Sequence, residues 1–351
     1  MRYPFDRHFY FPKRNIIDRL QTFYDSWRVN ARERRNIEPV IITPAKNVLP
    51  LDAEDLPLVF VTHNEMALTP AFLHHYRRLG VTRFICLDDV SSDGTREYLM
   101  DQPDVDVWTS PIRFAAARRG RRWREALFER YGYNRWYVNV DSDEFLVYDQ
   151  CLSEPLKALV EVLENNDIKR LPAPMLDFYP VGTSGNGSMP WHAVDHVDCS
   201  GYRVDFLKRG ISVKGGPRKR LFKEENELIK YPLIFWDKSC YFGSSIHRPL
   251  PYSRNFAPIW GVLLHFKFFT NYREKIGEAA SNRQHYNGSE HYQALKRELD
   301  KSGTIEFVGE SSIRFLNPEQ LIELGFMPTI EFDPDDERLG PVRNWSQSSY
   351  C

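Results

Sequence analysis

The stretch that most constrains the fold is a short apolar run that ends on three carboxylates. Residues 136–140 have the aromatic and β-branched composition of a buried strand, and Asp141, Asp143 and Glu144 follow at once. A second apolar run occupies residues 145–148. Carboxylates this close repel one another and require screening by water or a cation. The pattern therefore predicts either a solvated turn between two strands or a site for a hard divalent metal ion.

The region before this run alternates between two periodicities. A continuously apolar run predicts a buried strand at residues 58–62, and mainly apolar runs predict further strands at residues 83–87 and 105–108. Amphipathic segments predict helices at residues 70–79 and 95–100. Alternation of this kind predicts an α/β fold with a mainly parallel central sheet flanked by helices.

Acidic side chains follow several of the predicted strands. Parallel strands present their carboxyl ends at one edge of the sheet, which is where such folds bind ligands. We therefore expect that edge to collect the following residues: Glu65, Asp88, Asp89, Asp93, Asp141 and Asp143.

Composition excludes several classes of protein. The net charge is −1, so no overall field favours nucleic acid as a partner. The sequence has no apolar run of about 18 residues, as a transmembrane helix would need, and no apolar secretory core near Met1. Five widely spaced cysteines without a Cys-x-x-Cys pair suggest reduced thiols. We expect a cytoplasmic protein, at most associated with the inner face of the membrane.

An amphipathic helix is predicted over residues 16–35, inside an extension that covers residues 1–57. One face carries Ile16, Leu20, Phe23, Tyr24 and Trp27. The rest carries six arginines, namely Arg14, Arg19, Arg28, Arg32, Arg34 and Arg35. We expect this helix to pack on the chain's own domain. The alternative is contact of residues 14–35 with a membrane surface or an assembly complex.

Two further stretches are basic. Residues 113–135 contain eight arginines, most of them expected on a solvated helix face, with one or two close enough to the acidic edge to bind a diphosphate. Residues 214–222 combine two glycines with several cations. There we expect either a basic hairpin turn or contact of Arg218 or Arg220 with a diphosphate or an anionic acceptor.

The motifs taken together resemble a known family. They are Val61-Thr-His-Asn-Glu65, residues 72–80, Asp88-Asp-Val-Ser-Ser-Asp-Gly-Thr95 and Val140-Asp-Ser-Asp-Glu-Phe-Leu-Val147. In this order and spacing they resemble a family-2-like glycosyltransferase of the bacterial branch with an Asp-x-Asp-Glu-Phe motif. The resemblance is good over residues 58–150 and looser to about residue 268. It implies a GT-A fold, a nucleotide-sugar donor that is UDP-linked, and Mn²⁺ or Mg²⁺ as cofactor.

The resemblance also implies roles for individual residues. The donor would contact Thr62, Asn64, Glu65, Asp88, Asp89, Asp93 and Asp141. Asp143 would bind the metal, with Asp141 near the metal and the donor sugar. Many GT-A enzymes complete the metal shell with a late histidine, and His265 matches that place better than His247 does. The competing reading of His265 is a core histidine.

The second half of the chain supplies the candidate base. Attack by a sugar hydroxyl needs a carboxylate within hydrogen-bond reach, and Asp177 follows a predicted strand on the acceptor side. A turn-capping role is the alternative for Asp177, and weaker candidates for the base are Asp195, Asp198 and Asp205. Residues 271–299 predict a polar helix that includes His285 and Tyr286, and an acidic tail begins at Asp333.

These observations predict four regions and one leading function. The regions are an extension (1–57), a donor-binding half (58–150), an acceptor-binding half (151–270) and a C-terminal helical segment (271–351). The expected function is metal-dependent, inverting transfer of a sugar to a glycan or glycolipid acceptor in surface polysaccharide synthesis. The alternatives are a sugar-phosphate nucleotidyltransferase and a non-catalytic scaffold. A nucleotidyltransferase should carry a Gly-rich basic loop where residues 62–65 stand.

Overall fold

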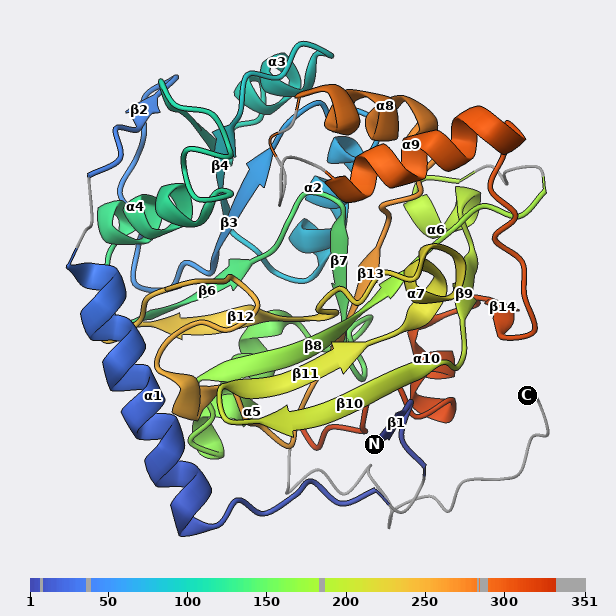
Figure 1. Cartoon of the computed structure of the whole chain (residues 1–351). Helices are drawn as coiled ribbons and strands as arrows, with labels where there is room; N and C mark the ends of the chain where they lie inside the picture. Colours follow the sequence, from blue (N-terminus) through green and yellow to red (C-terminus); the bar gives the residue numbers. More distant parts are fainter. Residues whose placement is uncertain (7–8, 36–38, 183–186, 283, 285–289, 333–351) are drawn as a thin grey trace.

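The core of the protein is one nine-stranded sheet (Figure 1). The computed structural model describes residues 1–6, 9–35, 39–182, 187–282, 284 and 290–332. Within these, the strand order across the sheet is β2 (Thr43–Pro44), β5 (Val105–Thr109), β4 (Arg83–Asp88), β3 (Pro57–Thr62), β6 (Arg135–Asn139), β12 (Ile229–Trp236), β8 (Arg170–Asp177), β13 (Val262–His265) and β7 (Glu144–Val147).

Most strands of this sheet point the same way. β5, β4, β3 and β6 pair in parallel, and β8 and β13 form a further parallel pair. β12 is antiparallel to both β6 and β8, so these two groups share one direction. Only β2, β12 and β7 run the other way among the strands of this sheet. The predicted α/β fold with a mainly parallel central sheet is confirmed.

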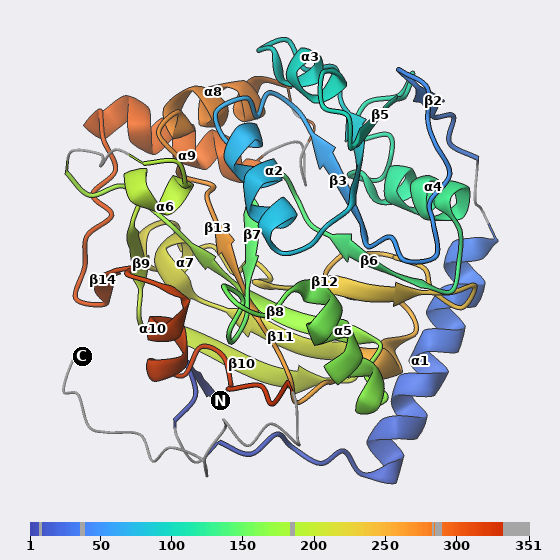
Figure 2. The same cartoon turned by 180° about the vertical axis from the view of Figure 1, so that it is seen from behind.

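Helices cover both faces of the sheet, which explains why β3 is apolar at every position. Leu58 and Phe60 belong to the core that includes α2 (Thr69–Arg78), α3 (Thr95–Met100) and α5 (Leu156–Asn165). Val59 and Val61 face the opposite core, with α4 (Arg121–Tyr131). α2 and α5 are in front of the sheet in the rear view (Figure 2). A strand that is buried on both faces has no solvent-facing side, so apolar and polar residues do not alternate along it.

The N-terminal extension is joined to the rest of the molecule. β1 (Arg2–Tyr3) pairs with β10 (Tyr202–Leu207), which also pairs with β11 (Gly210–Lys214). α1 (Ile16–Arg34) runs along one edge of the molecule (Figure 1). Its large apolar residues are exposed, and its buried residues are Thr22, Ser26 and Val29. The helix packs on the chain's own domain, as predicted, but through these small residues rather than through its large apolar ones.

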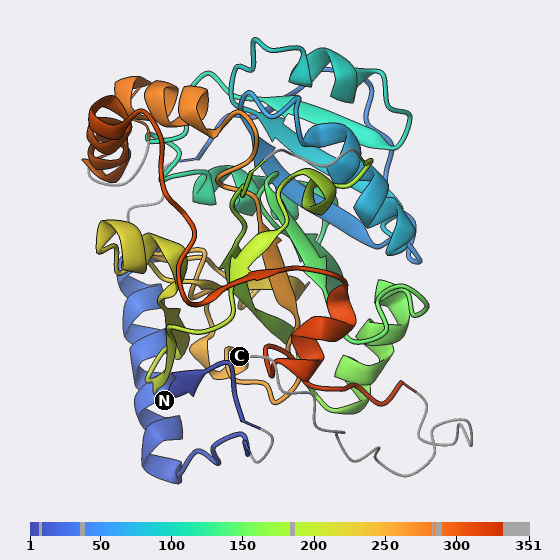
Figure 3. The ribbon, with the colours of Figure 1, turned by 90° about the vertical axis from the view of Figure 1, so that its right-hand side faces the viewer.

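The stretch predicted as one helix, residues 271–299, contributes to two helices in the structure. α8 (Tyr272–Asn282) and α9 (Glu290–Ser302) lie side by side at the end of the molecule that also carries α3 (Figure 3). His285, Tyr286 and the acidic tail from residue 333 lie outside the described residues. The remaining short elements are α6 (Pro190–Ala193), β9 (His196–Asp198), α7 (Gly216–Phe222), η1 (Tyr252–Arg254), β14 (Ser312–Arg314) and α10 (Pro318–Glu323). No described helix is both long and apolar enough to span a membrane.

Candidate active site

Strand register brings three polar residues into one row at the carboxyl edge of the sheet. On the parallel pair β8–β13, His265 stands opposite Asp177. On the antiparallel pair β13–β7, the same His265 stands opposite Glu144. Directly paired residues point to the same face of a sheet. Asp177, His265 and Glu144 are therefore neighbours, although Glu144 and His265 lie more than a hundred residues apart in the sequence.

His265 is held between two carboxylates. Its Nδ1 lies 2.5 Å from Asp177 Oδ1, and its Nε2 lies 3.3 Å from Asp143 Oδ2. Burial acts to lower the pKa of His265, but the two carboxylates outweigh burial and raise that pKa to about 9. Burial acts to raise the pKa of Asp143, and the charge of His265 outweighs it and lowers the pKa.

Asp177 is fully buried, and both of its oxygens have partners. Arg218 donates to Asp177 Oδ2 from Nε at 2.7 Å and to Oδ1 from Nη2 at 3.1 Å. His265 Nδ1 contacts the same Oδ1. Burial raises the pKa of Asp177, but Arg218 and His265 together lower it well below its usual range. This arrangement leaves Asp177 poorly placed to take a proton from an acceptor and well placed to orient the imidazole.

Asp143 and His265 fit a divalent metal ion. With Nδ1 committed to Asp177, the remaining nitrogen, Nε2, points at the Asp143 carboxylate. A carboxylate that fixes one ring nitrogen so that the other can bind metal is a recurrent arrangement in metalloproteins. Asp143, Glu144 and His265 each offer a ligand atom, and these atoms lie within 4.8 Å of one another. The mixed oxygen and nitrogen set suits manganese better than calcium.

Glu144 belongs to this cluster, but its oxygens are already in use. The Asp141 amide donates to Glu144 Oε2 at 2.9 Å, and Lys230 Nζ lies 2.5 Å from Glu144 Oε1. The Glu144 side chain is 1% exposed, and burial raises its pKa despite the nearby Lys230. Within the cluster, Asp143 and His265 are therefore the side chains whose facing atoms contact only each other among the described residues.

Asp141 turns away from that pair and toward two cations. It forms ion pairs with Arg124 from α4 and with Lys230 at the start of β12. Burial acts to raise the pKa of Asp141, and Lys230 and Arg124 reverse this and lower it. The Asp141 side chain stays 38% exposed, so it can also accept a hydrogen bond from a ligand.

Lys230 is a site residue that the sequence interpretation missed. β12 is antiparallel to its neighbours, so its first residues lie at the edge where the parallel strands end. Lys230 is 5% exposed within the apolar segment 228–236. A buried lysine needs a carboxylate partner, and this requirement is the signal that could have linked it to the acidic run.

The ends of β3 and β4 bring the other predicted donor residues together. Asp88 pairs with Arg96 at 3.0 Å, and Asp89 pairs with Arg113 at 2.8 Å. Asp93 accepts hydrogen bonds from the amides of Thr95 and Met66 at 3.0 and 2.9 Å. Thr62, the last residue of β3, is buried.

α8 packs against the loop that follows β3. Glu65 forms an ion pair with Lys275, and Glu278 accepts hydrogen bonds from both His63 and Asn64, each at 2.8 Å. Burial raises the pKa of Glu65 to about 7, although Lys275 acts to lower it. α8 thus contacts the predicted nucleoside pocket through charged groups.

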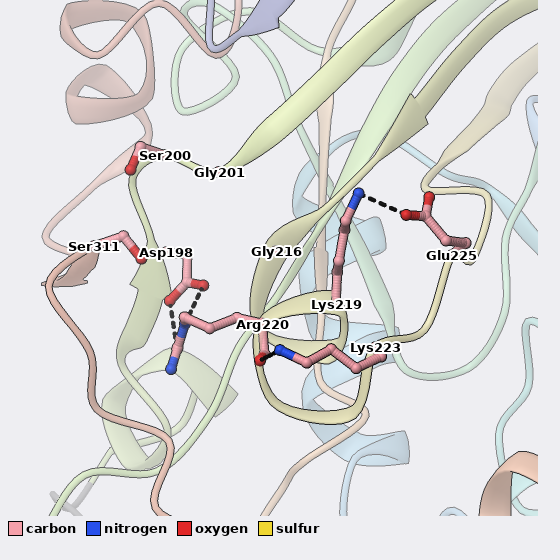
Figure 4. Close-up of a pocket in the computed structure, with 9 residues that line it drawn as sticks. All are labelled: Asp198, Ser200, Gly201, Gly216, Lys219, Arg220, Lys223, Glu225 and Ser311. Carbon is pink, nitrogen blue, oxygen red and sulfur yellow. Dashed lines mark hydrogen bonds and ion pairs between the residues drawn. The ribbon is translucent and has the colours of Figure 1, made fainter.

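The predicted arginines of α7 have different surroundings. Arg218 is buried on Asp177, whereas Arg220 pairs with Asp198 at 2.9 Å and lines a cavity of about 480 Å³ (Figure 4). Lys219 and Lys223 line the same cavity, and Lys219 pairs with Glu225 there. The residues of the metal cluster are not part of this lining.

The weaker candidates are paired elsewhere. Asp195 contacts His196 and Arg314, Asp198 contacts Arg220, and Asp205 contacts Arg203. His247 Nδ1 lies 2.8 Å from the carbonyl oxygen of Ile229, and burial lowers its pKa to about 4. None of these four side chains is among the possible metal ligands found in the described residues.

Comparison with known proteins gives structural likeness at low identity. No protein-family model matches the chain. No curated protein sequence matches it either. The mannosyltransferase PcManGT from Pyrobaculum calidifontis, in complex with GDP-Man and Mn²⁺, is similar over 45% of this chain and 44% of its own, with 17% identity and a TM-score of 0.25. The chain thus spans less than half of that structure.

Two nucleotidyl-transferring enzymes are similar to a comparable degree. A 4-diphosphocytidyl-2C-methyl-D-erythritol synthase matches 39% of this chain and 67% of its own at 16% identity, with a TM-score of 0.24. A UDP-glucose pyrophosphorylase from Acinetobacter baumanii matches 70% of this chain and 99% of its own at 8% identity, with a TM-score of 0.28. Likeness at this level assigns no activity, so the functional argument rests on the site itself.

Proposed function

We propose that this protein is a metal-dependent glycosyltransferase that uses a nucleotide-sugar donor. The observation that carries the proposal is the row Asp143–His265–Asp177, in which one imidazole nitrogen is fixed by a buried carboxylate and the other faces Asp143. It stands at the carboxyl edge of a mainly parallel sheet, the edge at which Asp88 ends β4 and Glu65 follows β3. That edge is where α/β sheets bind ligands.

The metal would be held by Asp143 and His265. Mn²⁺ or Mg²⁺ at this place would neutralise charge on the departing nucleoside diphosphate. Two cations of the chain, Lys230 and Arg124, hold Asp141 in place. The partly exposed side chain of Asp141 can accept a hydrogen bond from the donor. Asp88, Asp89 and Glu65 are proposed to line the nucleoside pocket.

Transfer would replace one bond at the anomeric carbon with another. An acceptor hydroxyl oxygen forms the new bond, the bond to the diphosphate oxygen breaks, and the hydroxyl proton passes to a base. Asp177 was predicted as that base and remains a candidate. Its burial and its contacts with Arg218 and His265 favour a positioning role instead.

The donor, acceptor and stereochemistry are proposed from the resemblance in the sequence. A UDP-sugar is the first donor to test, with a glycan or glycolipid hydroxyl as acceptor and inversion at the anomeric carbon. A sugar-phosphate nucleotidyltransferase would instead join a nucleoside triphosphate to a sugar phosphate. It would be expected to carry a basic Gly-rich loop after β3, where this chain has His63, Asn64 and Glu65 engaged with α8.

Analysis of the reaction products distinguishes the glycosyltransferase, the nucleotidyltransferase and the non-catalytic scaffold. The purified protein is incubated with a panel of nucleotide sugars and Mn²⁺, and nucleoside diphosphate is measured by chromatography. A parallel reaction supplies nucleoside triphosphates, sugar 1-phosphates and Mg²⁺, and pyrophosphate is measured. The proposal expects nucleoside diphosphate and free or transferred sugar. Pyrophosphate release would indicate the nucleotidyltransferase, and no turnover in either reaction would favour the scaffold.

A further inference from the structure

α1 contacts the rest of the protein through its small and polar side. The Thr22 hydroxyl donates to the carbonyl oxygen of Lys208 at 2.7 Å, and Ser26 Oγ accepts a hydrogen bond from the amide of Tyr252 at 2.9 Å. Val29 is the apolar residue of this side, in a small cluster with Tyr252 and two other residues. The helix is therefore attached without using its large apolar residues.

Those residues form one continuous stripe on the outer side. Ile16, Ile17, Leu20, Phe23, Tyr24 and Trp27 are between 59% and 73% exposed. Their spacing of three and four residues places them on one face of the helix. α1 lies at the margin of the molecule in both Figure 1 and Figure 2. A contiguous exposed apolar stripe of this kind marks a surface that meets another apolar phase.

The charges of the helix are sorted relative to this stripe. Two of its three acidic side chains, Asp25 and Glu33, turn inward, where each is 16% exposed and pairs with a cation of another segment, Arg209 and Arg118 respectively. The third, Asp18, is exposed on the side of the helix away from the stripe. At 3.6 residues per turn, Arg19 and Arg28 flank the stripe on opposite sides, and both are exposed. Exposed Lys13 and Arg35 lie just beyond the two ends of the helix.

We propose that the outer face of α1 docks the protein on the surface of an anionic lipid bilayer. A stripe of Leu, Phe and Trp with basic residues along its margins is the signature of a helix that lies in the plane of a membrane interface. Tyr24 and Trp27 suit that interface because their rings combine an apolar body with a polar group. The flanking arginines and Lys13 complement anionic headgroups.

The same features disfavour a second copy of this chain as the occupant. In a two-fold dimer through the stripe, each copy would bring its own Arg19 and Arg28 to the common rim. Like charges at a rim oppose association, whereas an anionic bilayer attracts the same groups.

Vesicle flotation with the full chain tests the proposal. We compare phosphatidylcholine vesicles with vesicles that contain about one third phosphatidylglycerol, at low and high salt. The wild-type protein is expected to float with the anionic vesicles, and less so at high salt or without phosphatidylglycerol. Phe23→Ser with Trp27→Ser should weaken binding at least about tenfold, because both side chains would leave the acyl boundary.

A charge variant and a control variant make the result specific. Arg19→Glu with Arg28→Glu should weaken binding to anionic vesicles at least about tenfold and remove the salt dependence. Ile41→Ser with Leu316→Ser removes two apolar side chains that are each 67% exposed outside α1, and binding should stay within about twofold of wild type. Equal flotation of wild type and Phe23→Ser/Trp27→Ser would overturn the proposal. Absence of flotation with anionic vesicles would overturn it too, and a dimer that the same variant dissociates would then identify a second copy as the occupant.

Discussion

Replacement of Lys230 is expected to destabilise the folded protein strongly and in a pH-dependent way. Lys230 is 5% exposed, and its ammonium lies 2.5 Å from the carboxylate of Glu144, which is 1% exposed. Lys230→Met leaves that carboxylate buried without its cation. Breaking one partner out of a buried pair costs about 3–5 kcal/mol. Asp141 adds little to the loss, because it keeps Arg124 and is 38% exposed.

Protonation of Glu144 limits this cost at low pH. Burial already raises the pKa of Glu144, and loss of Lys230 raises it further. A raised carboxyl pKa means that the folded state binds the proton more tightly than the unfolded state does. The free energy of unfolding then falls as pH rises from the unfolded pKa toward the folded one. We expect Lys230→Met to cost about 3 kcal/mol or more near pH 8, and distinctly less near pH 5.

Urea denaturation at the two pH values measures the effect. Lys157→Met is the matched control, since Lys157 pairs with Glu54 on the surface at 64% and 82% exposure. Exposed pairs contribute about 0–1 kcal/mol. Adding Glu144→Gln to Lys230→Met should recover part of the loss, because the unpaired charge is then gone. The reasoning fails if Lys230→Met costs no more than Lys157→Met, or if its cost is the same at both pH values.

Two further predictions concern the metal. Calorimetric titration should show that the affinity for Mn²⁺ rises with pH, by up to about tenfold per pH unit between pH 6 and 8. The reason is that His265 has a pKa of about 9 and must lose its proton to bind the metal. An affinity that does not change with pH would exclude His265 as a ligand. Asp177→Asn should weaken Mn²⁺ binding about 10–100-fold by releasing the imidazole; if binding is unchanged while turnover is lost, Asp177 is the base.

The parallel part of the fold was predictable because its sequence signals are local. A strand such as 58–62, buried on both faces, must be apolar throughout, and the carboxylates that follow it must then lie at the carboxyl edge. The same logic located Asp143, and the resemblance added His265. Register explains why the two meet: β13 joins the sheet between β8 and β7.

The parts that were missed depend on contacts between distant segments. The entry of Lys230 into the site follows from the antiparallel direction of β12, which no local pattern of residues 229–236 specifies. The sequence predicted no role for Glu144, because it did not identify Lys230 as the partner of this carboxylate. For α1, periodicity identifies the apolar face but not what covers it, so the attachment through Thr22 and Ser26 was not foreseen.

The central claim is that Asp143, with His265, holds a metal that makes a nucleotide sugar reactive. The direct measurement is donor turnover with and without Mn²⁺ for the wild-type protein, Asp143→Ala and the control Asp205→Ala, whose carboxylate pairs with Arg203 away from the cluster. We expect Mn²⁺-dependent turnover in the wild type and the control, and at least about a hundredfold loss in Asp143→Ala. Full donor turnover by Asp143→Ala would contradict the account.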